Sequence, residues 1–217
     1  GVADAASVRR NKSDAADFLT PWSPPGDLKR DLTPGKTAIR LASWSSETTL
    51  DYPPKKGMTI TEMVKNIRDR GYTSGNANTT RYARNRWMDA SDAEIRELKE
   101  ALSKYDVTFF DLHTTGSNIN SDLAEREKCN RYTVEACHAA ERAGAAMVTT
   151  HVGTVGGISP MSPHKDNWTM DTWKLGVRMM KQICRDSSGV SVPLGVEATN
   201  MTIMNNPRAH LRLIEEI

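Results

Sequence analysis

Two histidines and one glutamate in this sequence each follow a short apolar stretch. The residues are His113, His151 and Glu197, and the stretches before them are 107–112 (VTFFDL), 145–150 (AAMVTT) and 192–196 (VPLGV). Imidazole nitrogens and carboxylate oxygens bind divalent metal ions, and both groups transfer protons in enzymes. The three residue types therefore predict a metal site or acid–base chemistry, provided that the fold brings them together.

Each of the three residues also has an ordinary structural explanation. A glutamate at the end of a strand often caps the next helix, and a half-buried histidine often bonds to the backbone. The coincidence carries more weight, because all three stand at the same position relative to their apolar stretch, about 40 residues apart. This repetition favours a shared functional role over three separate structural ones.

The elements that must position these residues alternate between strand and helix. Strand candidates start near residues 38, 72, 107, 145 and 192, and an amphipathic pattern follows each of them. A repeat of this length is typical of βαβ units, which form a parallel sheet. Since the carboxyl ends of parallel strands lie at one edge, His113, His151 and Glu197 should meet there.

Local signals support the helices between these strands. Thr59 with Glu62 and Ser91 with Glu94 match the capping box, in which a hydroxyl and a carboxylate bond to free amides of the first turn. The expected helices end near three glycines, which are Gly71, Gly144 and Gly189. The last helix begins at Asn206-Pro207, with proline at its first position.

An α/β fold of this kind is either an open sheet or a closed barrel. No strand-to-helix turn has the glycine spacing of a Rossmann or Walker motif, and the segment 153–157 (GTVGG) has the wrong spacing for both. We therefore predict a (β/α)8 TIM barrel. A complete barrel needs about 250 residues. We expect an irregular N-terminal arm at 1–36 and, at 37–217, about the first five β/α units, incomplete at the C-terminus.

Composition limits the partners. Lysine plus arginine number 29 against 27 for aspartate plus glutamate, a net charge of +2 that argues against nucleic acid as the main partner. No apolar run is long enough to cross a bilayer, so we expect no membrane partner. The three cysteines, Cys129, Cys137 and Cys184, have no metal-type spacing and indicate reduced, buried thiols of a cytoplasmic protein.

The order of these motifs resembles the xylose isomerase-like TIM-barrel superfamily, which groups sugar phosphate isomerases and epimerases with endonuclease IV. The resemblance covers about Thr37 to Ile217 and rests on three segments: VTFFDLHTTGSNIN, AERAGAAMVTTHVGT and VPLGVEATN. In the family the third strand commonly ends in a histidine, the fourth in His-x-Gly and the fifth in a metal-binding glutamate. Here these are His113, His151-Val152-Gly153 and Glu197.

The resemblance implies a sugar isomerase, epimerase or lyase that removes a proton next to a carbonyl. It assigns Glu197 as metal ligand and acid–base catalyst, and His113, His151 and Asn200 to a sugar or glycoside substrate, with Trp44 as an apolar wall. The implied cofactor is Mn²⁺, Mg²⁺ or Co²⁺, whose remaining ligands come from strands six to eight. These are absent here, so we expect a homo-oligomer or completion by further chain.

Two other functions remain open at this stage. A zinc-dependent phosphodiesterase of the endonuclease type would use His113, His151 and Glu197 as ligands in a Zn²⁺ cluster. The one basic cluster that could grip phosphates comprises Arg81, Arg84 and Arg86, with Tyr82 and Trp87 interleaved. Alternatively, the absence of the later ligands would fit a non-catalytic subunit, a partial barrel that completes another chain.

Overall fold

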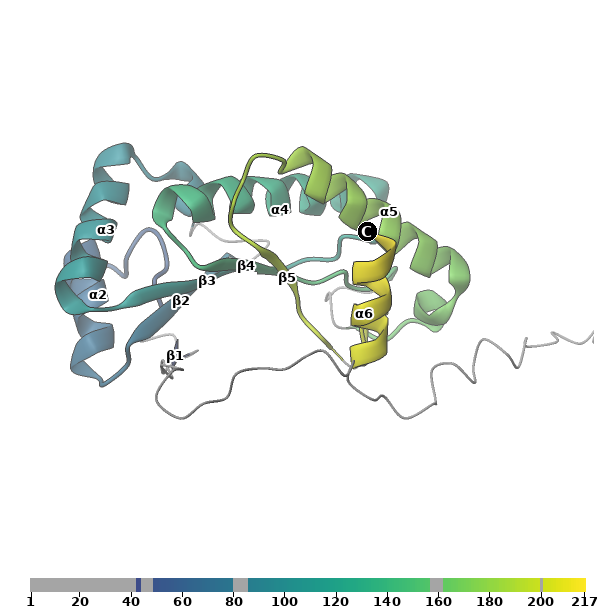
Figure 1. Cartoon of the computed structure of the whole chain (residues 1–217), viewed down its shortest axis with the longest axis horizontal. Helices are drawn as coiled ribbons and strands as arrows, with labels where there is room; N and C mark the ends of the chain where they lie inside the picture. Colours follow the sequence, from purple (N-terminus) through teal and green to yellow (C-terminus); the bar gives the residue numbers. More distant parts are fainter. Residues whose placement is uncertain (1–41, 44–48, 80–85, 157–161, 200) are drawn as a thin grey trace, which may run out of the picture. The chain divides into compact units, whose positions relative to one another are not determined.

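The computed structural model describes residues 42–43, 49–79, 86–156, 162–199 and 201–217 (Figure 1). The chain separates after Thr37 into two units, and all of the described residues lie in the second unit, Ala38–Ile217. The expected arm at 1–36 therefore lies outside the described residues. Among the described helices, none is both long enough and apolar enough to cross a membrane.

The described part of the chain forms a sheet of five parallel strands whose spatial order equals their order in the sequence. The strands are β1 (Ala42–Ser43), β2 (Ser74–Thr79), β3 (Thr108–Thr114), β4 (Met147–Thr150) and β5 (Leu194–Val196). Consecutive parallel strands that pair side by side, each followed by a helix, are the arrangement of a (β/α)8 barrel. The predicted fold class is confirmed, with five strands of such a barrel in view.

In the described ranges, five helices and two short 3-10 turns connect and cover the strands. They are α2 (Ile60–Asp69), η1 (Trp87–Asp89), α3 (Asp92–Tyr105), α4 (Leu123–Ala143), η2 (Lys165–Trp168), α5 (Met170–Asp186) and α6 (Pro207–Glu216). Both predicted capping boxes are present, with reciprocal bonds at the first turns of α2 and α3. Gly144 ends α4 in the left-handed conformation, with φ of 76°, as its sequence position predicted.

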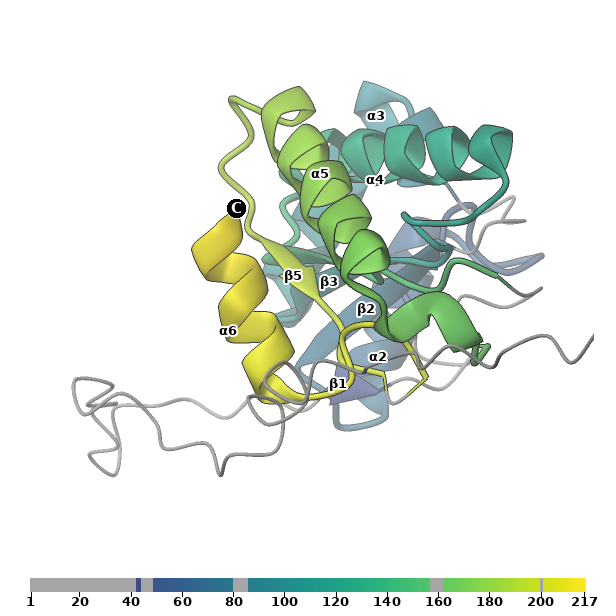
Figure 2. The same cartoon turned by 90° about the vertical axis from the view of Figure 1, so that its right-hand side faces the viewer.

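One face of the sheet is packed against helices. Leu112 of β3 and Val148 of β4 are fully buried in a cluster that also contains residues of α2, α3 and α4. A second cluster joins α5 and α6 to the loops after β4 and β5, through Val152 and Ile203. Figures 1 and 2 both show α4 and α5 over the same face of the sheet. We call this face the helix side and the opposite face the inner side.

A β-bulge interrupts the pairing of β2 with β3. Gly75 pairs with Phe109, but the next residue, Asn76, pairs with Asp111, so Phe110 is the extra residue. Bulges of this kind occur often near functional sites, where they redirect a side chain. Beyond the bulge, Leu112 faces the helix side, and its neighbours Asp111 and His113 therefore face the inner side.

Three local expectations differ from the structure. The strand expected at 72–76 starts two residues later, as β2, because Tyr72 still bonds to the end of α2 through Ile67 O. Cys184 is exposed, whereas Cys129 and Cys137 are buried as expected. Helix α5 ends at Asp186, before Gly189, because the hydroxyl of Ser187 turns back to bond the carbonyl of Ile183 at 2.7 Å.

Candidate functional site

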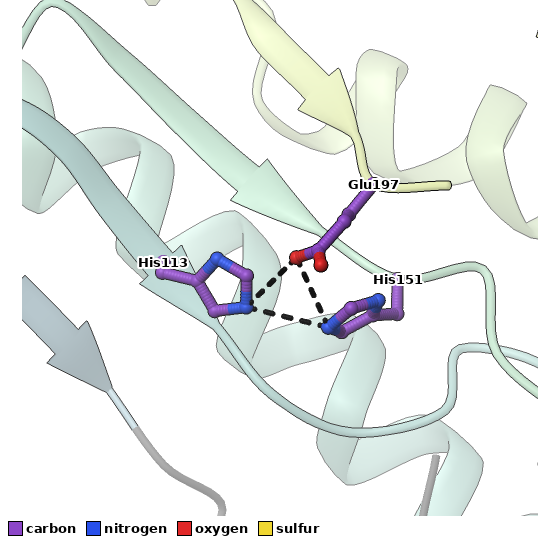
Figure 3. A group of neighbouring side chains, drawn as sticks. All are labelled: His113, His151 and Glu197. Atoms are coloured by element: carbon purple, nitrogen blue, oxygen red, sulfur yellow. Dashed lines mark hydrogen bonds and ion pairs between the residues drawn. The ribbon is translucent and has the colours of Figure 1, made fainter. Parts of the chain in front are cut away.

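The side chains of His113, His151 and Glu197 converge at the carboxyl ends of three neighbouring strands. The Nε2 atoms of the two histidines are 3.3 Å apart. Oε2 of Glu197 lies 3.5 Å from each of these nitrogens. Figure 3 shows the three side chains pointing toward one another from β3 and from the residues that follow β4 and β5. The convergence predicted from the strand ends is therefore present.

Strand alternation explains why all three side chains face the inner side. Leu112 pairs with Val148, and both are buried under the helices, so His113 points to the opposite face. The same alternation carries His151 inward after Thr150. The backbone N–H of Glu197 bonds to the carbonyl of Thr150 at 2.9 Å, which extends the β4–β5 pairing to the glutamate. The sheet thus determines the face on which all three side chains lie.

The two histidines are buried, whereas the glutamate is accessible. Only 4% of the His113 side chain and 5% of the His151 side chain are exposed, against 40% for Glu197. Burial lowers the pKa of His151 and nearby His113 lowers it further, while the carboxylate of Glu197 opposes them. A lowered pKa keeps the imidazole neutral, with a lone pair free for a proton or a metal ion.

This donor set fits a divalent metal ion. One ligand atom from each of the three residues can be chosen so that all lie within 4.8 Å of one another. Tetrahedral binding to imidazole and carboxylate atoms at about 2.0–2.2 Å requires ligand atoms about 3.3–3.6 Å apart. The observed separations of 3.3 and 3.5 Å match that spacing. Two imidazoles and a carboxylate also leave positions of the ion open, as in catalytic sites.

Two more polar side chains lie buried on the inner side, one layer below this group. Oδ2 of Asp111 is 3.6 Å from Nδ1 of His113. Within the described residues, Oδ1 of Asp111 and both polar atoms of the Asn76 amide have no hydrogen-bond partner. Carboxylates that approach the second nitrogen of a metal-binding histidine orient its ring and select its tautomer. Asp111 occupies that place relative to His113.

Sequence reasoning singled out neither Asp111 nor Asn76. A signal for Asp111 was available, because it stands two residues before His113, and residues two apart in a strand share a face. Asn76 carried no such signal, since its position next to Asp111 depends on the bulge at Phe110, which the sequence does not reveal. The bulge therefore decides which polar side chain neighbours the site.

Other expected site residues lie outside the described part of the chain. This holds for both Trp44 and Asn200, which were assigned to the substrate. In the basic cluster, Arg86 and Trp87 are described. The guanidinium of Arg86 pairs with Glu135 at 2.6 Å, and Trp87 is fully buried, with its indole N–H bonded to the carbonyl of Leu50. Trp87 is therefore part of the hydrophobic core, and the charge of Arg86 is paired with a carboxylate of α4.

Comparison with known proteins places this site in a family. The model of a family described as xylose isomerase-like TIM barrel matches residues 64–217, which include all three residues of the site. No curated protein matches the sequence.

Solved structures with a similar fold include sugar epimerases. An L-ribulose 3-epimerase aligns with a TM-score of 0.59 and 14% identity, over 82% of this chain and 57% of that chain. A 3-keto-D-glucoside 4-epimerase from E. coli aligns at 0.57 and 13%, over 79% and 64%. A xylose isomerase-like TIM barrel protein from Mycobacterium smegmatis, in complex with magnesium, aligns at 0.51 and 17%, over 72% and 52%. The chain thus spans about half to two thirds of the length of these proteins.

Proposed function

The chain belongs to the xylose isomerase-like TIM barrel family, and from this premise we propose that it takes part in divalent-metal-dependent isomerisation, epimerisation or elimination of a sugar. The substrate class is a ketose or a 3-oxo-glycoside. The proposal is supported by two sugar epimerases among the similar structures and by the magnesium complex of a third similar protein, the xylose isomerase-like TIM barrel protein from Mycobacterium smegmatis.

The observation that carries the proposal is the place of Glu197. Its side chain is 40% exposed, while the imidazoles of His113 and His151 beside it are almost fully buried. Both short contacts of the carboxylate are made by the same oxygen, Oε2. This leaves a carboxylate that is anchored on one side and open to a substrate on the other, at the strand edge where barrel enzymes react.

In the proposed reaction, the carboxylate of Glu197 takes the proton from the carbon next to a substrate carbonyl, and the electron pair moves to the carbonyl oxygen as an enediolate forms. Delivery of a proton to the other face of the same carbon, by a second acid opposite Glu197, would give an epimer. Return of the proton to the former carbonyl carbon, with the hydroxyl proton passing to the former carbonyl oxygen, would give an aldose–ketose isomerisation. In a 3-oxo-glycoside, the electron pair instead expels the group at C1.

His113, His151 and Glu197 would hold the divalent ion, with Mn²⁺, Mg²⁺ and Co²⁺ as the first candidates. When bound, such an ion supplies Lewis-acid polarisation of the carbonyl and its neighbouring hydroxyl. The buried histidines exclude water from one side of the carboxylate, which strengthens the electrostatic interactions of the group with a substrate. The Nε2 atoms of both histidines face the position proposed for the ion and their Nδ1 atoms are buried, so this arrangement uses the two imidazoles for the ion and leaves the sugar to the exposed side of Glu197.

The direct test is Glu197→Gln, which preserves the shape of the side chain but removes its charge and basicity. We expect loss of turnover, incorporation of no solvent deuterium next to the carbonyl, and a lower metal content by elemental analysis. The thermal unfolding midpoint should change little, because Glu197 is partly exposed. Wild-type protein, stripped with a chelator and reloaded with each ion in turn, should exchange that proton for deuterium with one ion at least.

A matched control is Glu127→Gln, on the exposed surface of α4. It removes the same charge and should leave deuterium exchange and metal content unchanged. Turnover of ketoses or 3-oxo-glycosides by Glu197→Gln at the wild-type rate would overturn the assignment.

A second candidate, a zinc-dependent phosphodiesterase, is favoured by the donor set. Two imidazoles and one glutamate are a known ligand set for catalytic zinc. In that case all three residues would serve as zinc ligands, and the substrate would be a phosphodiester instead of a sugar. His151→Ala would then remove most of the bound zinc and stop cleavage of DNA with an abasic site. In the sugar enzyme the same variant should also weaken binding of the ion, so the wild-type protein separates the two candidates: it should exchange the proton of a ketose or 3-oxo-glycoside and leave abasic DNA uncleaved.

A further inference from the structure

The three loops that carry the chain away from the site are fastened to one another by buried side chains. Each loop begins at a residue of the site or within two residues of it: 115–122 follows His113 and Thr114 of β3, the second loop starts with His151 after β4, and 198–206 follows Glu197 after β5. The fastening residues are Ser117 and Asn167, which are 3% and 2% exposed. Within the described residues, the side-chain hydrogen bonds of both go to residues other than His113, His151 and Glu197.

Ser117 joins the first of these loops to the second. Its hydroxyl accepts the backbone N–H of Thr154 at 2.9 Å and donates to the carbonyl of the same residue at 2.6 Å. Gly153 makes this approach possible. It has φ of +91°, and a Cβ at this position would lie 2.3 Å from the Ser117 oxygen. Only glycine fits there, so the chain just beyond His151 is held against the loop that follows His113.

Asn167 joins the second loop to the third. Its Oδ1 accepts the hydroxyl of Thr154 at 2.8 Å and the backbone N–H of Val155 at 3.0 Å. Its Nδ2 donates to the carbonyl of Met201 at 2.9 Å. One buried amide therefore connects the loop that leaves His151 with the loop that leaves Glu197.

The orientation of this amide is fixed by its partners. A backbone N–H can only donate and a carbonyl can only accept, so the amide oxygen must face Val155 and the amide nitrogen must face Met201. Asparagine satisfies both ends, whereas aspartate of the same shape would place an oxygen against the carbonyl of Met201. The network thus requires the amide and not merely a polar side chain.

We propose that Ser117 and Asn167 are positioning residues that set the separations among His113, His151 and Glu197 before any ion binds. The hydrogen bonds of Ser117 and Asn167 link the three loops that follow the three ligands. They limit how far the ends of β3, β4 and β5 can move apart, at the point where backbone pairing between the strands stops. This inference rests on the metal centre of the proposed function. It adds that the affinity of the centre depends on side chains that lie outside it.

The test compares Asn167→Asp with Asn130→Asp. Asn130 lies on α4, where its amide contacts Met179 of α5, so the control makes the same chemical change in the helix layer. Apo protein of each variant is titrated with Co²⁺ and Zn²⁺ against a chromophoric chelator, at a temperature where circular dichroism shows it to be folded. The visible spectrum of the Co²⁺ form reports ligand geometry.

We expect Asn167→Asp to weaken metal binding by about 10-fold or more and to alter the Co²⁺ spectrum, as changes around metal ligands commonly do. Asn130→Asp should change the affinity by less than about 3-fold, even if it lowers the unfolding midpoint, because the amide of Asn130 bonds to Met179 of α5 and takes no part in the Ser117–Asn167 network. Ser117→Ala should act in the same direction as Asn167→Asp. If Asn167→Asp does not fold, Thr154→Val replaces it, since it removes one bond to the amide and keeps the shape.

Two results would overturn the inference. Wild-type affinity and spectrum in both Asn167→Asp and Ser117→Ala would show that the loops do not set the ligand geometry. Imidazole NMR signals of the apo protein give a second measure, which needs no metal. Signals of His113 and His151 that stay unmoved in Asn167→Asp would refute the positioning role. If wild-type protein binds no ion but these signals move, the proposed metal centre fails while the positioning role stands.

Discussion

The two faces of strands β3 to β5 are built on opposite principles. On the helix side, Leu112 and Val148 are fully buried among apolar neighbours of α2, α3 and α4. On the inner side, Asp111, His113 and His151 are almost equally buried, but they are polar and ionisable. The same short strands form both faces, because consecutive side chains of a strand point alternately to one face and to the other.

The difference lies in what each face does for the protein. Burial of apolar area on the helix side stabilises the fold, because it removes that area from water. Burial of imidazoles and a carboxylate on the inner side costs free energy unless a partner compensates it. Within the described residues, Oδ1 of Asp111 and Nδ1 of His151 have no hydrogen-bond partner. The inner side thus contributes less to the stability of the fold than the helix side does.

The largest effect should come from the helix side. Leu112→Ala removes a fully buried side chain from the centre of the core cluster, and we expect a loss of about 2–5 kcal/mol in the free energy of unfolding. Urea denaturation measures this loss. Phe110→Ala, two residues earlier in β3 and 46% exposed, is the control and should cost less than about 1 kcal/mol. Comparable losses in both variants would break the distinction between the faces.

Much of this arrangement could be predicted from the sequence, since it depends on local patterns. Strand and helix alternation gave the parallel sheet, the capping boxes gave the starts of α2 and α3, and the three strand ends gave His113, His151 and Glu197. Other features depend on contacts between distant segments. The bulge at Phe110 depends on the pairing of β2 with β3, and the three side-chain bonds of Asn167 connect it to residues far away in the sequence. No pattern of neighbouring residues predicts either feature.

An intermediate effect is expected for Asp111→Asn on the inner side. The variant keeps the size of the side chain but removes the carboxylate beside Nδ1 of His113, so the imidazole loses the group that orients it. We expect the affinity for the metal ion to fall about 10-fold, which is a typical loss when a group that orients a metal-binding histidine is removed. The stability of the apo protein should hardly fall, because a poorly bonded buried carboxylate costs free energy. An unchanged affinity, or a large loss of stability, would contradict a supporting role.

The smallest effects should come from two strand glycines, one on each face. Gly75 in β2 faces the helix side, where a Cβ would lie 2.7 Å from Cδ1 of Ile67 and 2.9 Å from Cγ of Leu50. Gly195 in β5 faces the inner side, where a Cβ would lie 2.6 Å from the terminal methyl group of Met147 and no closer than 3.6 Å to any other atom.

The same substitution should therefore have different costs at the two glycines. Gly75→Ala must displace a branched carbon of the packed core, and we expect a loss of about 1–3 kcal/mol in the free energy of unfolding. In Gly195→Ala the flexible end of Met147 can move away, and alanine also restricts the unfolded chain, so the net change should stay within about 1 kcal/mol. Denaturation of both variants under the same conditions measures the difference. An equal or greater cost at Gly195 would mean that the inner side is packed as tightly as the helix side, which would leave no room there for a sugar.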